Sequence, residues 1–499
     1  MKKNQFFLML IYLLFLASTA AATEASSSSS QELAARIQRV GNGLIPNPGV
    51  VVKDQPSKKA SLAERMKAYR VPGLSLAVIN GYAIEWEEGY GVQESGGTSP
   101  VTPETLFQAA SISKPVAAAT ALYYVEKGIL GLDEDVNSRL RTWKIPDNTW
   151  TRKGKVTLRA LLSHTAGLTV HGFPGYAEGK DLPSLRQILD GVKPANTPPI
   201  KVDIEMGSRF RYSGGGYTVL QQLLIDILGR PFPYIVRDAV LIKLDMRQST
   251  FEQPLPRALA DAAASGHRPD GSVLPGKWHT YPEMAAAGLW TTPTDLARFA
   301  LEILLAKEGK SDRVLSHVMV EMMLTPVKEN CGLGLMVKGS GQDLQFSHGG
   351  GNEGFRCYLM AYPKRGQGAV IMTNSDLGSD FMPELLRSLS AEYGWPDFKP
   401  VEKVTATVSA SELEALAGTY QFTPADRIKI SPGNGCIFAD PVFVPPDGKA
   451  NCVFFPESAA SFFSTETDVT LTFIKSPQGK VTGLTWRRGE NKRKAVKIK

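Results

Sequence analysis

Cysteine and histidine are scarce in this chain, whose 499 residues include four cysteines and six histidines. Nowhere do they stand at the close spacing that zinc ligands need, so neither a metal site nor another cofactor is expected. The sequence Gly-x-Ser-x-Gly is also missing, which leaves an α/β-hydrolase fold without an obvious nucleophile. After the amino-terminal segment, no apolar run reaches the roughly 20 residues that cross a bilayer. A metalloenzyme, an α/β-hydrolase and a multispan membrane protein are therefore not expected.

The amino-terminal residues have the pattern of an export signal. Lys2 and Lys3 precede the apolar run Phe6–Ala17, and Ala20 and Ala22 follow at the spacing of a cleavage site. Because the run is shorter than a typical membrane anchor, the pattern favours cleavage. We therefore expect a signal peptide over residues 1–22, a periplasmic or secreted mature protein, and contact with the membrane only during export.

The charge balance is basic, with a net charge of +7 and a pI near 9.0. Basic residues are scattered except in the tail Arg487–Lys499, so nucleic acid is not expected as a partner, while an anionic cell-wall polymer stays open. An exported protein meets an oxidising compartment, where disulfides are permitted. The most local pairing joins Cys331 to Cys357 and Cys436 to Cys452, but the sequence does not choose among the three connectivities.

Shifts in composition divide the chain. A serine run, Ser26–Ser30, opens a polar stretch that is expected to be flexible, and Pro396 and Pro400 interrupt a second polar stretch. A chain of this length exceeds what one hydrophobic core usually organises. The expected segments are a signal peptide at 1–22, a flexible lead-in at 23–57, a first domain at 58–395, a linker at 396–411 and a second domain at 412–499.

Apolar patterning predicts both helices and strands in the first domain. An Asn80-Gly81 turn between two apolar runs is typical of a strand pair, and Pro115 is compatible with the first turn of an alanine-rich helix. The second domain has short strands between turns, which predicts a small all-β barrel. Expected helices are 60–69, 111–126, 158–163, 217–228 and 294–306, and expected strands are 74–79, 84–92, 343–347, 355–362, 369–373, 418–422, 469–474 and 483–486.

Ser111 and Lys114 form the only Ser-x-x-Lys in the chain. At this spacing on a helix the two side chains lie on one face and can touch. A serine hydroxyl becomes a nucleophile when a base takes its proton, and a lysine can act as that base if its surroundings lower its pKa. The helix start adds backbone donors for an oxyanion. The pair therefore predicts a serine nucleophile activated by lysine.

Further motifs accompany this pair along the chain. They are VPG at 71–73, FQAASISK at 107–114, LLSHTAGL at 161–168, YSG at 212–214, AAGLWTTPTDLARF at 286–299 and HGG at 348–350. Together they resemble the serine β-lactamase-like hydrolases, which include class C β-lactamases, penicillin-binding proteins, D-aminopeptidases and related esterases. The resemblance covers most of residues 58–395. It implies an α+β fold of the β-lactamase/transpeptidase type, an antiparallel sheet with a helical lobe.

The same resemblance implies roles for individual residues. Tyr212 matches a tyrosine that shuttles protons to the leaving group. Because a free phenol titrates near pH 10, this role calls for cationic neighbours, and Lys114 and His348 are the candidates. His348, with Gly350, matches a strand motif that reads Lys-Thr-Gly in β-lactamases and His-x-Gly in many relatives. Gly351 would supply an oxyanion donor beside the amide of Ser111.

Two positions depart from the β-lactamase pattern. Gly214 stands where β-lactamases carry an asparagine that binds the acyl side chain of the substrate, and glycine has no such amide. His348 replaces a lysine that holds a substrate carboxylate, and an imidazole is mostly neutral at pH 7. Both departures favour an ester, or a peptide of the D-amino-acid type, over a β-lactam.

Two other patterns are rejected on context. Gly349, Gly351 and Gly354 spell Gly-x-Gly-x-x-Gly, but a strand rather than a helix is expected to follow, so a dinucleotide-binding loop is not predicted. His164 is not favoured as the base of Ser111, because Lys114 fills that role and a histidine at a helix end more often packs or caps.

The expected function is that of an exported serine hydrolase that forms an acyl-enzyme on Ser111. A β-lactamase or D-Ala-D-Ala carboxypeptidase is the alternative, and a cell-wall ligand sensor without turnover is the second. The segments LAGTY at 416–420 and GKVTGLTW at 479–486 resemble the lipocalin-like barrel of some related peptidases. Whether this barrel covers the active-site mouth or mediates oligomerisation stays open, as does the oligomeric state.

Overall fold

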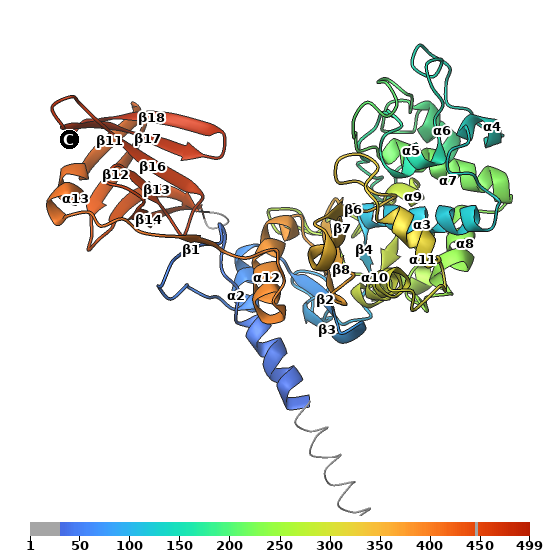
Figure 1. Ribbon diagram of the computed structural model, residues 1–499, viewed down its shortest axis with the longest axis horizontal. Helices are drawn as coiled ribbons and strands as arrows, with labels where there is room; N and C mark the ends of the chain where they lie inside the picture. The colour runs from blue at the N-terminus through green and yellow to red at the C-terminus, as the bar shows by residue number, and fades with distance from the viewer. Residues whose placement is uncertain (1–29, 445–447) are drawn as a thin grey trace, which may run out of the picture. The chain divides into compact units, whose positions relative to one another are not determined.

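The computed structural model describes residues 30–444 and 448–499, which form two compact units (Figure 1). The larger unit is Tyr69–Asp380, and the smaller unit combines the described residues up to Ala68 with Phe381–Lys499. The expected signal peptide lies outside the described residues. Within the ranges described, no helix has the length and apolar character to cross a membrane. The domain boundaries expected from the sequence remain predictions.

The larger unit is built on a six-stranded antiparallel sheet in the order β3-β2-β9-β8-β7-β6. Within this sheet the first strand, β2, lies beside the last strand, β9. Their register runs from Leu74↔Thr373 to Ile79↔Gly368. The expected hairpin is confirmed, since β2 and β3 pair up to Asn80↔Ala83, but the turn consists of Gly81 and Tyr82, one residue later than predicted. The strands are β2 (Gly73–Asn80), β3 (Ala83–Gly91), β6 (Met336–Lys338), β7 (Gln345–Asn352), β8 (Phe355–Tyr362) and β9 (Gln367–Thr373).

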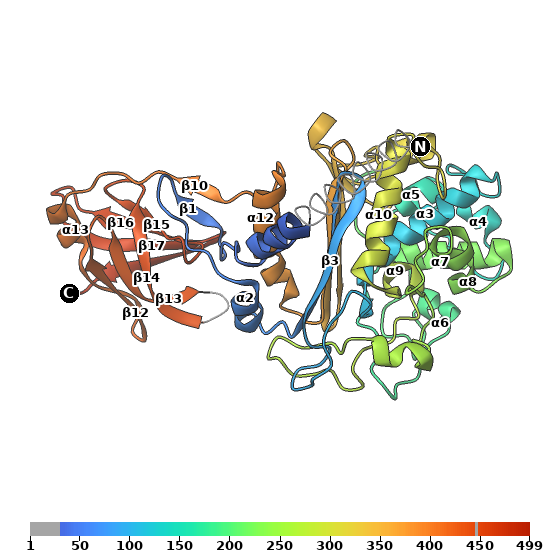
Figure 2. The same ribbon diagram turned by 90° about the horizontal axis from the view of Figure 1, so that it is seen from below.

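The helices of the larger unit form a lobe beside the sheet (Figure 2). Helix α10 lies against β2, β3, β8 and β9. Helix α3 is buried on all sides from Ser113 to Leu122, as expected of a helix that is apolar all round. The helices are α3 (Ser113–Glu126), α4 (Val136–Arg139), α5 (Leu158–Leu162), α6 (Leu185–Asp190), α7 (Gly214–Leu228), α8 (Phe232–Val236), α9 (Met284–Ala287), α10 (Pro293–Lys307) and α11 (His317–Met323).

A few shorter elements connect these parts. Strands β4 (Phe107–Gln108) and β5 (Trp290–Thr291) pair with each other, and one turn of 3₁₀ helix, η1 (Ala110–Ile112), leads directly into α3. Pro115 is therefore the third residue of α3, where a missing N–H costs no helical hydrogen bond. The predicted α+β fold, a sheet with a helical lobe, is confirmed.

The smaller unit contains a closed eight-stranded barrel, as predicted. Its interior is apolar and aromatic, with Tyr420, Phe454, Phe462 and Leu471 fully buried. Helix α13 (Ala410–Leu416) precedes the barrel and begins with a capping box between Ser409 and Glu412. The strands are β11 (Gly418–Thr423), β12 (Asp426–Pro432), β13 (Ile437–Val444), β14 (Gly448–Pro456), β15 (Ser461–Phe463), β16 (Val469–Lys475), β17 (Val481–Arg488) and β18 (Asn491–Lys497).

The polar lead-in differs from the flexible segment expected from its composition. Residues 30–41 are helical, and β1 (Val50–Val52) pairs in parallel with β10 (Val401–Lys403). Helix α2 (Leu62–Ala68) follows, and α12 (Gly378–Tyr393) provides partners: Arg36 and Arg39 both bond the carboxylate of Glu392. These partners lie more than 350 residues away, so local composition gave no sign of them.

All four cysteines are free and buried, so none of the three possible connectivities is formed. Cys331 lies within hydrogen-bonding distance of the Gly332 carbonyl at 3.4 Å, and Cys357 of the Ala109 carbonyl at 3.0 Å. Burial raises the pKa of the Cys331 thiol to about 12, so this group stays protonated. These cysteines act as small buried side chains.

Candidate active site

Ser111 lies in the single turn η1 at the start of the buried helix α3, where its side chain is partly exposed. The residue before it, Ala110, has a φ of +48°, which is uncommon for a residue with a side chain. Hydrogen bonds hold the segment in place, because the Ala109 N–H donates to the Leu289 carbonyl at 2.9 Å. Backbone strain of this kind persists only where the surroundings fix it, and it clusters at functional sites.

Lys114 lies one turn further along and is 2% exposed. Its Nζ donates to Ser111 Oγ at 3.0 Å and to the Ala286 carbonyl, at the end of α9, at 2.8 Å. Burial lowers the pKa of Lys114 to about 7, because a charged ammonium is poorly solvated there. At neutral pH a large fraction of the amine is therefore free to accept the proton of Ser111.

Tyr212 completes the group, since its hydroxyl is hydrogen-bonded to Ser111. The Nζ of Lys114 lies 4.8 Å from the centre of the Tyr212 ring. Burial raises the pKa of Tyr212, and the hydrogen bond to Ser111 offsets this only in part. Cationic neighbours were expected from the sequence to adjust this phenol, but in the structure loss of solvent is the largest cause of its pKa shift. The phenol is protonated at neutral pH and is placed to donate.

Three histidine rings surround Tyr212. The ring centres of His164, His171 and His348 lie 4.4, 4.9 and 6.2 Å from its own. His164 Nδ1 accepts a hydrogen bond from the Ser213 N–H at 3.0 Å, and burial keeps the pKa of His164 well below its usual value. His164 is thus a neutral packing partner of Tyr212. This arrangement agrees with the choice of Lys114 over His164 as the base.

His348 and the glycines after it lie on the part of β7 that has a strand on one side only. Strand β6 pairs with β7 only up to Ser347, so the segment from His348 to Asn352 leaves one edge free of strand pairing. This segment approaches η1 so closely that a side chain on Gly350 would come within 2.3 Å of the Ala109 carbonyl. Burial and the nearby Lys114 lower the pKa of His348 to about 4, so its imidazole is neutral. A free edge beside Ser111 suits an extended substrate.

Gly214 is the first residue of α7, two residues after Tyr212. Its N–H donates to the His171 carbonyl at 3.0 Å. A Cβ placed on Gly214 would lie 2.9 Å from Cε2 of Phe173. The space that a side chain would take at this position is therefore filled by an aromatic ring. The structure thus brings together Ser111, Lys114 and Tyr212, with Gly214 two residues beyond the tyrosine.

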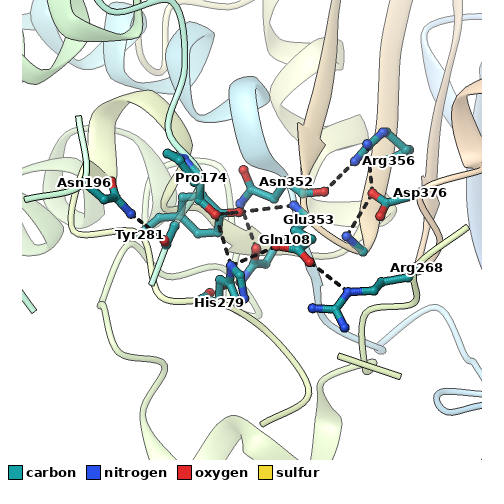
Figure 3. A network of polar contacts seen from close by, with 12 residues as sticks. Gln108, Pro174, Asn196, Arg268, His279, Tyr281, Asn352, Glu353, Arg356 and Asp376 are labelled. Carbon is teal, nitrogen blue, oxygen red and sulfur yellow. Dashed lines mark hydrogen bonds and ion pairs between the residues drawn. The ribbon is translucent and has the colours of Figure 1, made fainter. Parts of the chain in front are cut away.

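A buried polar cluster joins the free part of β7 to the residues before Ser111 (Figure 3). The side-chain nitrogen of Asn352 donates to Gln108 Oε1 at 2.7 Å and to the Ala287 carbonyl at 3.1 Å. Gln108 Nε2 in turn donates to the His279 carbonyl at 2.7 Å. Asn352 thereby connects three parts of the site, namely β7, the lead-in to Ser111 and the helix α9 that holds Lys114.

The cluster extends outward along the β7–β8 turn. Glu353 accepts from Arg268 Nε at 3.1 Å and lies 3.4 Å from His279 Nδ1. Tyr281 accepts from the Glu353 N–H at 3.2 Å and donates to the Pro174 carbonyl at 3.3 Å. These contacts hold the turn against the loop that contains Phe173 and Pro174.

Four residues near the site were missed by the sequence analysis. They are Gln108, His171, Phe173 and Asn352. Gln108 lies inside the motif FQAASISK and Asn352 follows HGG by two residues, which is a signal that could have found them. Nothing in the local sequence marks Phe173. Among the residues described, no cluster of three or more His, Cys, Asp or Glu side chains could hold a metal ion.

The fold and the Ser111–Lys114 pair together define a serine hydrolase of the β-lactamase type. The sequence profile of the β-lactamase family matches residues 59–391, and the chain belongs to this family. Penicillin-binding protein 4 of Amycolatopsis lactamdurans is 27% identical over 392 residues, which are 73% of this chain and 98% of that relative.

Solved structures show the same fold at low sequence identity. An octameric penicillin-binding protein homologue from Pyrococcus abyssi superposes with a TM-score of 0.58 at 19% identity, over 87% of this chain and 98% of that one. EstCE1, a hydrolase with promiscuous acyltransferase activity, gives 0.56 at 20% identity, over 72% and 98% of the two chains.

Proposed function

We propose that this protein is an exported serine hydrolase that forms an acyl-enzyme on Ser111, with an ester or a peptide of the D-amino-acid type as substrate. The observation that carries the proposal is the hydrogen-bonded group of Ser111, Lys114 and Tyr212 at the start of a buried helix. In the proposed organisation, residues 58–395 form the catalytic domain and residues 412–499 a lipocalin-like barrel.

The reaction begins when neutral Lys114 takes the proton of Ser111 Oγ. The oxygen then bonds to the substrate carbonyl carbon, and the oxyanion is stabilised by the N–H groups of Ser111 and Gly351. As the carbon–oxygen or carbon–nitrogen bond breaks, Tyr212 gives its hydroxyl proton to the leaving group and recovers one from the Lys114 ammonium. Water then attacks the acyl group by the same proton route in reverse, which releases the acid and restores Ser111.

The departures at Gly214 and His348 support an ester or peptide over a β-lactam. Gly214 offers no amide for an acylamide side chain, and the neutral imidazole of His348 offers no positive charge for a substrate carboxylate. Acyl transfer through Ser111 is further supported by the likeness to EstCE1, a hydrolase with promiscuous acyltransferase activity. Antibiotic hydrolysis and D-Ala-D-Ala carboxypeptidase activity are the alternative, and a sensor that acylates without turnover is the second.

Ser111→Ala tests the proposal directly. A fluorophosphonate probe should label the unchanged protein with one probe per chain, and the variant should not react. Ser138→Ala is a suitable control, because Ser138 is exposed and its hydroxyl donates only to the Asp135 carbonyl. Labelling that survives in Ser111→Ala would contradict the assignment of the nucleophile.

A substrate panel separates the alternatives. Nitrocefin, short-chain nitrophenyl esters and D-amino-acid nitroanilides represent the three substrate classes, and we expect turnover of the second or third and little of the first. A stable mass increase on Ser111 with no released product would favour the sensor instead. Amino-terminal sequencing of the exported protein, with a first residue near position 23, would support the signal peptide.

A further inference from the structure

The ring of Phe173 lies against Gly214, two residues after Tyr212, where the chain has no side chain. A Cβ on Gly214 would lie 2.9 Å from Cε2 and 3.4 Å from Cδ2 of Phe173. Real Cβ atoms essentially never approach another heavy atom as closely as the first of these distances. Glycine at position 214 is therefore what allows the ring to lie against the start of α7.

The loop that carries Phe173 wraps around Tyr212. His164, at one end of this loop, packs on the Tyr212 ring, and so does His171, two residues before Phe173. Phe173 itself is half-buried and packs against the core of the larger unit, so it is held in place and still partly accessible. An accessible aromatic side chain that is held in place is suited to contact an apolar part of a ligand.

Polar groups around Gly214 are already bonded within the protein. The His171 carbonyl accepts from the Gly214 N–H, and Ser213 Oγ accepts from the Gly216 N–H at 2.9 Å while it donates to the Thr169 carbonyl at 2.8 Å. A substrate group in this place meets the ring of Phe173 first, and the His171 carbonyl, 3.1 Å from the same point, already accepts a hydrogen bond. Apolar groups gain by leaving water for such a surface, whereas polar groups lose their hydration without a new partner.

We infer that Phe173 is a specificity-determining residue that selects an apolar acyl group, aliphatic or aromatic and without a polar substituent next to the scissile carbonyl. This inference rests on the proposed function, because it assumes that acylation occurs on Ser111. The inference places the Phe173 ring against the acyl part of the substrate. In β-lactamases the asparagine that corresponds to Gly214 binds the same part. Neutral esters or amides of apolar acids are the substrate class.

The test compares acyl chain lengths in the full-length protein. In the unchanged protein, kcat/KM should rise from nitrophenyl acetate to butyrate, because the added methylenes reach the ring. Phe173→Ala should reduce the butyrate-to-acetate ratio at least fivefold, and Phe173→Leu should keep most of it. Tyr234→Ala is the control, since Tyr234 is an exposed aromatic residue on α8. An unchanged ratio in Phe173→Ala would overturn the inference.

A double substitution tests the contact itself. Gly214→Ala should lower kcat/KM for butyrate at least tenfold, because the new Cβ collides with the ring, and adding Phe173→Ala should recover part of that loss. Independent, additive effects of the two substitutions would contradict the inference. Fluorophosphonate labelling of each variant counts the active sites. If Ser111 is not labelled even in the unchanged protein, the proposed function fails; if it is labelled and the ratio does not change, only the role of Phe173 fails.

Discussion

At the scale of single residues, the lowered pKa of Lys114 has a measurable consequence. Neutral Lys114 is the active form, so kcat/KM should rise as pH increases through about 7 and level off above it. Lys114→Arg should lose at least a thousandfold in kcat, because a guanidinium stays protonated. A pH–rate profile of the unchanged protein measures this rise of kcat/KM with pH. A rate that does not change between pH 6 and 8 would contradict the role of Lys114 as base.

Stability should follow the same group. The folded protein holds Lys114 at a pKa of about 7, whereas the unfolded chain binds its proton up to the ordinary value of 10.5. Between these pH values the unfolded state binds more protons, so this residue's contribution to the free energy of unfolding increases with pH. Lys114→Met removes the buried amine, and this variant should therefore be relatively more stable than the unchanged protein at pH 7 than at pH 10. Denaturation curves at the two pH values provide the measurement.

At the scale of structural elements, Asn352 connects β7 to β4 and α9. Asn352→Ala removes both donated hydrogen bonds and leaves Gln108 Oε1 without this donor. We expect kcat to fall about tenfold or more with little change in KM. The reason is that β7, which carries the proposed oxyanion donor Gly351, loses its position relative to Ser111. Loss of a buried partner should also cost about 1–3 kcal/mol of unfolding free energy. Steady-state kinetics and denaturant unfolding measure the two effects separately.

Two further variants separate positioning from mere structural support. Asn352→Asp has nearly the same shape but no N–H donor, so kcat should stay low. Asn196→Ala removes an asparagine of the neighbouring loop whose Nδ2 donates to the Gly175 carbonyl at 2.8 Å, and it should leave kcat within a factor of about two. Full activity in Asn352→Asp would show that the hydrogen bonds do not position the site.

Elements were predictable from the sequence where their signals are local. The strands around Asn80, the helix after Ser111 and three of the eight barrel strands follow from periodicity, turn residues and the position of Pro115. The contacts of the site were not predictable in the same way. Asn352 and Gln108 are 244 residues apart, and Phe173 and Gly214 meet only because a loop folds back on α7. Such pairings depend on tertiary packing, which local patterns do not encode.

The pKa values show the same limit. Surroundings that lower the pKa of Lys114 were expected from the sequence, and in the structure burial is their one named cause. For Tyr212 burial acts in the opposite direction and outweighs the hydrogen bond to Ser111. How deeply a side chain is buried depends on the whole fold, so the residue types were predictable while their proton affinities were not.

At the scale of the whole molecule, segments from the two ends of the chain meet in the smaller unit. Glu384 on α12 is fully buried, and it accepts from Arg65 Nε on α2 at 2.7 Å, from Arg65 Nη2 at 3.1 Å and from the Asn47 N–H at 2.8 Å. A paired and hydrogen-bonded carboxylate is tolerated in such a place, but an unpaired one is costly. This ion pair therefore holds the amino-terminal segment in the smaller unit.

Arg65→Ala should consequently destabilise the smaller unit by about 3–5 kcal/mol, because it leaves the Glu384 charge buried without its cation. Arg39→Ala is the matched control: Arg39 also bonds a carboxylate of α12, that of Glu392, but it is largely exposed, so little change is expected. Denaturant unfolding, with hydrogen exchange on α2 and α12 as the readout, measures the effect. The double variant Arg65→Met with Glu384→Leu should recover much of the lost unfolding free energy. Equal stability of Arg65→Ala and Arg39→Ala would show that the buried pair does not hold the two segments together.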